Sequence, residues 1–203
     1  MTPHGTFIVN GVERVVVPQL ARSFGVFFTD NELKGKQYFG AKVIPVRGVW
    51  IEIESESDGT MYVRIDRKRK FSLASLLRIM SELPDEKIIA QFDDVVSDVP
   101  YIKNSFAKDP AKKIDESYIE IYRKLRDNDL ATVANAKEFL QSMFGPERYD
   151  ISYVGRFSFN KRFGMDLGKE EMDRRTLSFS DMVTAIKHVV ALNNDPNAKK
   201  DDI

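Results

Sequence analysis

The sequence of 203 residues contains no cysteine and only two histidines, His4 and His188. Without thiols the chain cannot build a disulfide scaffold, a thiolate zinc site, an iron–sulfur cluster or a cysteine nucleophile. A serine–histidine triad or a two-histidine metal site would need one or both of the histidines. The sequence also lacks a Walker-type phosphate loop, a dinucleotide-binding glycine motif and a nucleophile elbow. These absences exclude most familiar enzyme classes.

No stretch approaches the roughly 18 apolar residues of a membrane helix, and the first five residues lack the pattern of a signal peptide. We therefore expect no membrane partner and a cytoplasmic location. Lysine plus arginine is 31 and aspartate plus glutamate is 31, so the net charge is zero. This balance argues against a wholly basic nucleic-acid binder, but it is compatible with a local basic patch. The apolar share of 42% is enough to build a core.

The first third of the chain has the patterns of short strands. Asn10-Gly11 predicts a tight hairpin turn, because both residue types tolerate positive φ. The segment 49–54 alternates apolar and polar residues, which is typical of a half-buried strand, and 61–65 is its expected partner. Further short strands are expected at 7–9, 12–17, 25–28 and 42–44.

Helices are expected after Phe71. Apolar stripes at helical spacing run over 73–83, 88–92, 114–125, 133–143 and 182–190. Ser72, Thr132 and Ser178 are the expected N-caps, and Asp181 completes a capping box with Ser178. The polar stretches 29–37, 93–113 and 164–177 are expected to be linkers. Strands followed by helices predict an α+β fold of mixed short strands and helices.

The segment 64–70 contains five basic residues among seven. Such a run can bind phosphates by releasing counterions, although a charge run alone is usually a solvated strand end. Two features favour nucleic acid. Asp66 inside the run could accept a hydrogen bond from a base, and Trp50, the sole tryptophan, could stack on one from the preceding strand. Two further segments combine basic and aromatic residues and are weaker signals. One contains Arg148-Tyr149-Asp150 and Gly155-Arg156, and the other is Arg22-Ser23-Phe24.

Read together, these motifs resemble the beta subunit of bacterial DNA-directed RNA polymerase. The resemblance rests on rare segments that occur in the family's order along the whole chain. They are 5–17 (Gly-Thr-Phe-Ile-Val-Asn-Gly-Val-Glu-Arg-Val-Val-Val), Gln19-Leu20, Arg22-Ser23, Ile44-Pro45, 47–50 (Arg-Gly-Val-Trp), 63–70, 120–126, Arg148-Tyr149-Asp150, Val154-Gly155-Arg156 and Asp201-Asp202-Ile203.

The resemblance implies a lobe domain inserted into part of a protrusion domain. Residues 1–13 would belong to the protrusion, 14–150 would form the lobe, and 151–203 would return to the protrusion. The first and last segments should then meet in space, with the hairpin at Asn10-Gly11 near the helix around Ile186. Both ends of the chain resemble cuts in a longer subunit.

The resemblance also implies roles for individual residues. In the family this region forms one jaw of the DNA cleft, over downstream DNA and the unwound bubble. The position matched by Trp50 stacks on an unpaired non-template base. Those matched by Arg22, Asp66, Asp150 and Arg156 line a pocket for a neighbouring flipped guanine, so we expect all five side chains to converge on one concave surface. Arg67 and Arg69 are expected to bind DNA through charge, and Val17 and Gln19 to lie at the rim of the rifamycin pocket.

This sequence departs from the family pattern at three places. Phe24 replaces a usual proline, which puts the direction of Arg22 in question. Pro18 replaces a usual serine, so a backbone donor is lost beside the expected rifamycin rim. Residues 127–130 replace a proline- and glycine-rich turn.

The implied partners are DNA, the beta prime, alpha and omega subunits, and a sigma factor. We expect a cytoplasmic, nucleoid-associated part of a nucleotidyltransferase that carries no catalytic residue, no metal site and no cofactor itself. In the family, the catalytic magnesium is bound by another subunit. Two alternatives stay open at this stage: a free-standing nucleic-acid-binding module, and a small enzyme acting on an unknown metabolite.

Overall fold

The structure is a computed structural model that describes residues 1–33, 35–126 and 130–202. The expected turn at 127–129 and the terminal Ile203 lie outside the described residues. The elements, in chain order, are β1 (Phe7–Val9), β2 (Val12–Arg14), β3 (Gly25–Leu33), β4 (Lys36–Ile44), β5 (Ile51–Ser55), β6 (Met61–Ile65), β7 (Phe71–Ser72), α1 (Leu73–Ser81), α2 (Asp85–Ala90), α3 (Tyr101–Lys108), α4 (Ile114–Leu125), α5 (Val133–Phe144), α6 (Ser152–Arg162), α7 (Lys169–Asp173) and α8 (Phe179–Asn194). This mixture confirms the α+β class.

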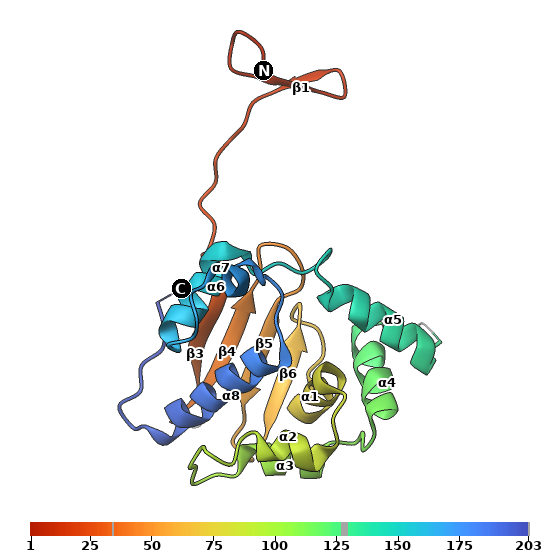
Figure 1. Ribbon diagram of the computed structural model, residues 1–203, viewed down its shortest axis with the longest axis vertical. Coiled ribbons are helices and arrows are strands. Elements are labelled where there is room, and N and C mark those ends of the chain that lie inside the picture. Colours follow the sequence, from red (N-terminus) through yellow and green to blue (C-terminus); the bar gives the residue numbers. More distant parts are fainter. Residues whose placement is uncertain (34, 127–129, 203) are drawn as a thin grey trace.

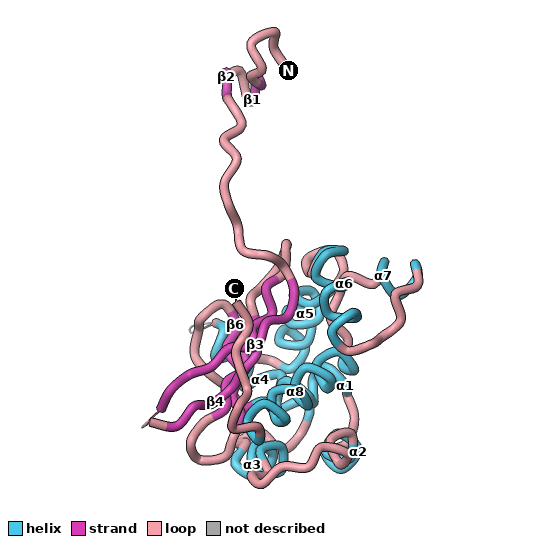
Figure 2. Tube along the Cα trace, turned by 90° about the vertical axis from the view of Figure 1, so that its left-hand side faces the viewer, coloured by secondary structure: helices cyan, strands magenta, loops and turns pink. Residues whose placement is uncertain are grey.

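The body consists of a sheet layer and a helix layer (Figures 1 and 2). Strands β3 to β7 form an antiparallel sheet in sequence order. Helix α8 lies against β4, where Asn193 exchanges hydrogen bonds with the backbone of Phe39. The opposite sheet face carries charged cross-strand pairs such as Lys42–Glu52 at 3.0 Å. The sheet is therefore apolar toward the helices and polar on its other side, as an antiparallel sheet allows.

Several helix starts follow the local sequence rules. The side chains of Ser72, Thr132 and Ser178 each accept a hydrogen bond from the first turn of α1, α5 and α8, and Asp181 completes the capping box. Left-handed φ angles of 53° at Asn10 and 75° at Gly11 confirm the predicted hairpin turn.

Three expected linkers contain regular structure. The described residues of the polar segment 29–37 lie at the tip of the β3–β4 hairpin, whose register continues to the pair Leu33 and Lys36. Helix α3 lies within 93–113, and α7 within 164–177. These predictions were wrong because the hairpin tip and α7 are mostly polar, and because α3 packs its apolar residues Tyr101, Ile102 and Phe106 into the core within an otherwise polar segment.

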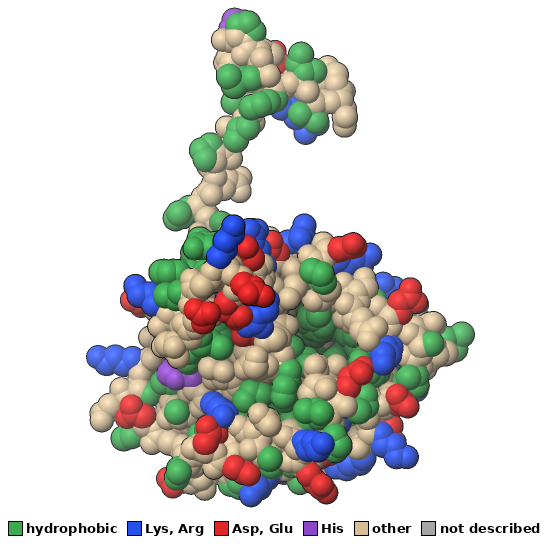
Figure 3. Space-filling model, viewed as in Figure 1, with side chains coloured by type: hydrophobic (Ala, Val, Ile, Leu, Met, Phe, Trp, Pro, Cys, Tyr) green, Lys and Arg blue, Asp and Glu red, His purple; other side chains and the backbone are tan. Residues whose placement is uncertain are grey.

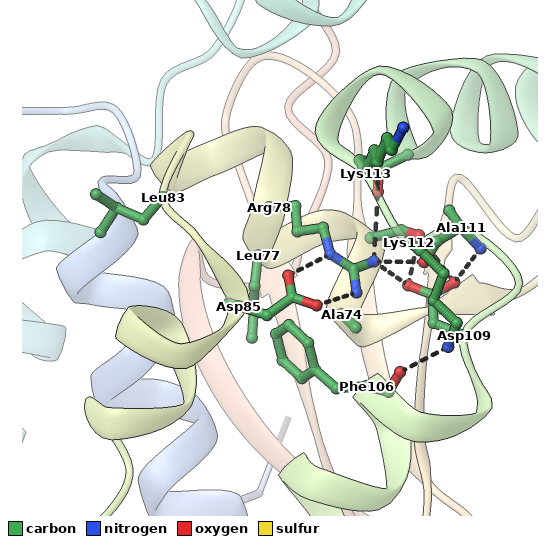
Figure 4. A network of polar contacts seen from close by, with 12 residues as sticks. Ala74, Leu77, Arg78, Leu83, Asp85, Phe106, Asp109, Ala111, Lys112 and Lys113 are labelled. Carbon is green, nitrogen blue, oxygen red and sulfur yellow. Dashed lines mark hydrogen bonds and ion pairs between the residues drawn. The ribbon is translucent and has the colours of Figure 1, made fainter.

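A buried arginine joins the helices that cover the sheet (Figure 4). The Arg78 side chain is 1% exposed, and its guanidinium donates to Asp85 Oδ1 at 2.6 Å and to Asp109 Oδ2 at 2.7 Å. It also donates to the carbonyl of Ala111 at 2.8 Å. Since a buried charge is tolerated only when it is paired and hydrogen-bonded, this network fixes α1 against α2 and the α3–α4 connection.

The structure does not divide the chain at residue 150. One hydrophobic core contains residues from both sides of that position, including Phe28, Ile53, Leu77, Ile186 and Val189. Residues on both sides of the predicted boundary thus share one core, and the assignment of 14–150 to the lobe stays a prediction.

The N-terminal hairpin stands apart from this core, at the end of the extended segment 15–24 (Figures 1 and 2). Ile8 in the hairpin is 68% exposed, whereas Ile186 in α8 is fully buried. The expectation that these two segments meet was therefore wrong for this structure, because α8 uses its apolar face to cover β4.

Candidate nucleic-acid interface

Several segments meet at one end of the five-stranded sheet, which we call the loop end. Strands β3 and β5 begin there and β4 and β6 end there, because Gly25 pairs with Ile44, and Ile51 pairs with Ile65. The N-terminal segment leaves the body at the same end (Figure 1). Lys and Arg side chains gather over this end among carboxylates (Figure 3). The topology thus brings segments that are distant in sequence to one surface.

Trp50 and Asp66 form a closed pair of hydrogen bonds at the loop end. The Asp66 N–H donates to the Trp50 carbonyl at 3.0 Å, and the Trp50 N–H donates to Asp66 Oδ1 at 2.8 Å. The Arg67 guanidinium carbon lies 5.7 Å from the Trp50 ring centroid. Trp50 is half-buried, whereas Asp66 and Arg67 are exposed. The residue before β5 and the turn after β6 therefore present an indole, a carboxylate and a cation side by side, and we call these three residues the Trp50 turn.

The conformation of this turn explains why an aspartate lies inside a basic run. Asp66 and Arg67 have left-handed φ angles of 48° and 59°, and the Lys68 N–H closes the turn on the Ile65 carbonyl at 3.0 Å. Asparagine and aspartate tolerate this region better than other side chains with a Cβ. Asp66 thus has a structural role in the turn in addition to any role toward a ligand.

Much of the basic run is engaged within the fold. Arg64 pairs with Glu54 at 3.2 Å, and Lys70 pairs with Glu56. The Lys68 ammonium donates to the Leu125 carbonyl, the last residue of α4, at 2.7 Å. Arg67 and Arg69 are exposed, and Arg67 is the one of these two that lies over Trp50.

Asp150 is held at the loop end because it pairs with the loop between β4 and β5, which also contains Trp50. Its N–H donates to the Arg47 carbonyl at 2.8 Å, and its carbonyl accepts from Val46 N–H at 2.8 Å. The Asp150 carboxylate is partly committed: Oδ1 accepts from the Ser152 N–H at 2.6 Å, and Oδ2 lies 3.7 Å from Nη1 of Arg175.

Tyr149 is a buried residue that precedes Asp150 and packs on the β4–β5 loop. It is 1% exposed, and its hydroxyl has no hydrogen-bond partner among the described residues. Burial, with a smaller contribution from the negative charge of Asp66, raises the pKa of Tyr149. The ring packs so closely on Gly48 that a Cβ there would lie 2.8 Å from Tyr149 Cδ2. Tyr149 therefore packs on the loop that contains Gly48 and Trp50, next to Asp150 in the chain.

Arg156 occupies a different environment from the one expected. Its side chain is fully buried, and Nη1 donates to Asp181 Oδ1 at 2.9 Å. Burial by itself would raise the pKa of Asp181, but hydrogen bonds from Arg156 and Ser178 outweigh burial and hold that pKa below its ordinary value. Arg156 is thus a structural cation in this structure. The expectation that it faces an exposed base pocket is corrected by this burial.

The remaining predicted residues lie in the N-terminal segment. Arg22, Val17 and Gln19 are all exposed. Arg22 is three residues before Gly25, whose backbone lies against Gly155 of α6, so Arg22 is attached to the loop end. The structure therefore places Trp50, Asp66, Arg67 and Asp150 at the loop end, attaches Arg22 to the same end through the chain and buries Arg156.

Sequence reasoning missed Arg47, Tyr149 and Arg175 as parts of this arrangement. Arg47 and Tyr149 lie inside recognised motifs but carried no assigned role, and Arg175 lies in an expected linker. Among the described residues, no group of three or more His, Asp or Glu side chains could hold a metal ion. No helix in the described ranges is both long and apolar enough to cross a bilayer.

Comparison with known proteins gives one consistent family. The family model of RNA polymerase Rpb2, domain 2, matches residues 25–203. The match begins at the first residue of β3, so it covers the body and omits the N-terminal hairpin and extended segment.

Curated relatives agree with this match. The DNA-directed RNA polymerase subunit beta of Bifidobacterium adolescentis is 38% identical over 195 residues, which cover 95% of this chain and 16% of that protein. The subunit of the same name from an Exiguobacterium species is 42% identical over 185 residues, or 87% of this chain and 15% of that protein. That of Macrococcus caseolyticus is 44% identical over 164 residues, or 80% of this chain and 14% of that protein. The chain thus spans about a sixth of the length of these relatives.

Proposed function

The chain belongs to the family of RNA polymerase beta subunits, and from this membership we propose that it works as part of a bacterial DNA-directed RNA polymerase. In that enzyme it forms one jaw of the DNA cleft, and it contacts downstream DNA and unpaired bases of the non-template strand. Its partners are DNA, the beta prime, alpha and omega subunits and a sigma factor, in the bacterial cytoplasm. The nucleotidyl transfer and its magnesium ions belong to another subunit.

One observation supports base capture above the others: Trp50 is hydrogen-bonded to the exposed Asp66, and the exposed Arg67 lies near its ring. A half-buried indole offers a face on which any base can stack. A carboxylate beside it accepts hydrogen bonds from the amino and imino edge of guanine. Val17 and Gln19 lie on the exposed segment that leads to this end, in keeping with a proposed rifamycin rim.

The Trp50–Asp66 hydrogen bond allows readout and loop organisation to be tested separately. Asp66→Asn keeps an oxygen that can accept the Trp50 N–H but removes the charge and one acceptor, whereas Asp66→Ala removes both functions. The measurement is the open-complex lifetime of the assembled polymerase on templates that differ at one non-template base. If Asp66 reads guanine, Asp66→Asn shortens the lifetime on the guanine template and leaves the other three nearly unchanged.

Asp58→Asn is the matched control, because Asp58 lies in the turn at the other end of the same β5–β6 hairpin and bonds to Thr60. Trp50→Ala should shorten the lifetime on all four templates, by about 1–3 kcal/mol of lost stacking. Equal shortening for all bases by both Asp66 variants would show that the aspartate only organises the turn. A free-standing module would instead bind single-stranded DNA with the same preference without any other subunit.

A further inference from the structure

Three exposed arginines, Arg47, Arg148 and Arg175, belong to the segments that meet at Asp150 at the loop end, and we call them the arginine rim. Arg47 pairs with Asp150 through the backbone, and Arg148 precedes it by two residues. The Arg175 side chain is 50% exposed, with Nη1 at 3.7 Å from Asp150 Oδ2. The Arg175 guanidinium therefore faces the Asp150 carboxylate, whose Oδ1 accepts from the Ser152 N–H at 2.6 Å. The Arg47 guanidinium lies on the adjacent loop, where Nη2 donates to the Pro146 carbonyl at 3.3 Å.

The position of Arg175 is fixed from inside the protein. The buried Arg156 guanidinium donates to the Arg174 carbonyl at 2.8 Å and to the Thr176 carbonyl at 2.7 Å. The Arg175 carbonyl accepts from the Ile151 N–H at 2.9 Å. The backbone on both sides of Arg175 is thus held by a cation that is itself paired with Asp181. Arg175 is held beside Asp150 by this clamp.

The rim is continuous with the Trp50 turn. Arg47 and Trp50 belong to one loop, and Tyr149 packs against Gly48 between them. The turn supplies a stacking face and an acceptor, whereas the rim supplies donors and net positive charge. These are the complementary needs of a single nucleotide strand, whose bases stack while its phosphates require cations.

We propose that the arginine rim binds the backbone phosphates of the strand whose base stacks on Trp50, and that Asp150 holds Arg175 toward those phosphates instead of reading a base itself. The inference rests on the proposed function, because it extends the same site along the strand. Arg156 then acts as a positioning residue through the Arg174–Thr176 segment.

The test uses the assembled polymerase with Arg175→Ala, Arg148→Ala and the double variant. Each lost phosphate contact should reduce the slope of log lifetime against log salt concentration by about 0.7, the value for single strands. The loss should be equal for all four bases at the non-template position. Arg175→Lys should restore most of the slope, since a phosphate needs a charge but not the guanidinium fork. Arg123→Ala, an exposed arginine of α4, is the matched control.

Three results would each contradict phosphate binding by the rim. They are an unchanged slope in the double variant, a loss of lifetime confined to one base, and a slope that Arg175→Lys does not restore. The Trp50→Ala and Asp66→Asn variants test base capture by itself, so an error in the rim proposal can be told apart from an error in the proposed function. If those two shorten the lifetime while the rim variants do not change the slope, base capture stands and the rim is wrong. If the rim variants flatten the slope while those two have no effect, phosphate binding by the rim stands, but base capture at Trp50 and the path of one strand across both sites are wrong.

Discussion

Tyr149 carries a buried hydroxyl that the fold leaves without a partner among the described residues. An unsatisfied buried polar group costs free energy of folding, whereas its replacement by an apolar group of the same shape can be neutral or stabilising. We therefore expect Tyr149→Phe to leave the free energy of unfolding unchanged or to raise it by up to about 1–2 kcal/mol. Denaturant unfolding measures this quantity.

Tyr118 provides the contrast, because its buried hydroxyl lies 3.1 Å from Glu82 Oε1. Tyr118→Phe should lower the stability by about 0.5–1.5 kcal/mol. If Tyr149→Phe were the more damaging of the two, the Tyr149 hydroxyl would have a partner in the folded state after all.

Gly48 is required by both its backbone angle and its surroundings. Its φ is 115°, and a Cβ would lie 2.8 Å from Tyr149 Cδ2 and 2.9 Å from the Arg148 carbonyl oxygen. We expect Gly48→Ala to destabilise the protein by about 2–4 kcal/mol, since the strain of the angle adds to the clash. It should also shorten the open-complex lifetime, because Gly48 connects Tyr149 to the Trp50 loop.

Gly164→Ala isolates the contribution of the backbone angle. Gly164 also has a positive φ, 62°, but a Cβ at this position would meet no atom within 4 Å beyond its chain neighbours. The substitution should cost only about 1 kcal/mol in thermal or denaturant unfolding. Equal costs at the two glycines would show that the contact with Tyr149 relaxes freely.

At the scale of elements, the sequence predicted what short-range rules control. The Asn10-Gly11 turn and the caps at Ser72, Thr132 and Ser178 depend on a few neighbouring residues, so they could be read directly. Helix α6 could not, because its buried face consists of Gly155, Arg156, Phe159 and Asn160 instead of an apolar stripe. The polar residues on that face have partners from later in the chain: Asn160 donates to the Asp166 carbonyl before α7, and Arg156 donates to carbonyls of the segment after α7 and to Asp181 of α8.

The contact between α6 and α8 makes stability depend on pH. Asp181 has a folded-state pKa below its ordinary value, so the unfolded chain takes up a proton first as the pH falls. The pair therefore stabilises the fold fully above the unfolded pKa of about 3.9, and this contribution is lost as the pH falls through the lower folded pKa. The free energy of unfolding should decline in this acidic window, as measured by urea unfolding at several pH values.

Asp181→Asn should flatten that decline, and at neutral pH it should cost about 3–5 kcal/mol because Arg156 is left as an unpaired buried charge. Asp93→Asn is a suitable control, since Asp93 is exposed and no ion pair is seen for it among the described residues, and it should leave the curve close to that of the unsubstituted protein. If the free energy of unfolding of Asp181→Asn declined with acid as steeply as that of the unsubstituted protein, the pH dependence would come from other carboxylates.

For the whole molecule, the sequence predicted the family and the α+β class, but not how the site is assembled. Trp50 and Asp66 could be placed together because they belong to one hairpin. Their proximity to Asp150 depends on a backbone pairing with Arg47 that no local pattern encodes. The burial of Arg156 depends on Asp181, whose capping role was visible while its ion pair was not. Long-range pairing of this kind is decided by the assembled fold, not by periodicity.

The separation of the N-terminal segment from the core is a property of the whole molecule that can be tested directly. Val15, Val16 and Val17 are 66–68% exposed, and the core lies entirely beyond residue 24. Because residues 1–24 contribute no side chain to that core, a chain of residues 25–203 should unfold with a free energy within about 0.5 kcal/mol of the full chain. Removing this exposed apolar segment should also reduce self-association, as measured by analytical ultracentrifugation. A truncated chain that is clearly less stable would mean that the hairpin packs on the body in solution, which is the arrangement expected from the family order.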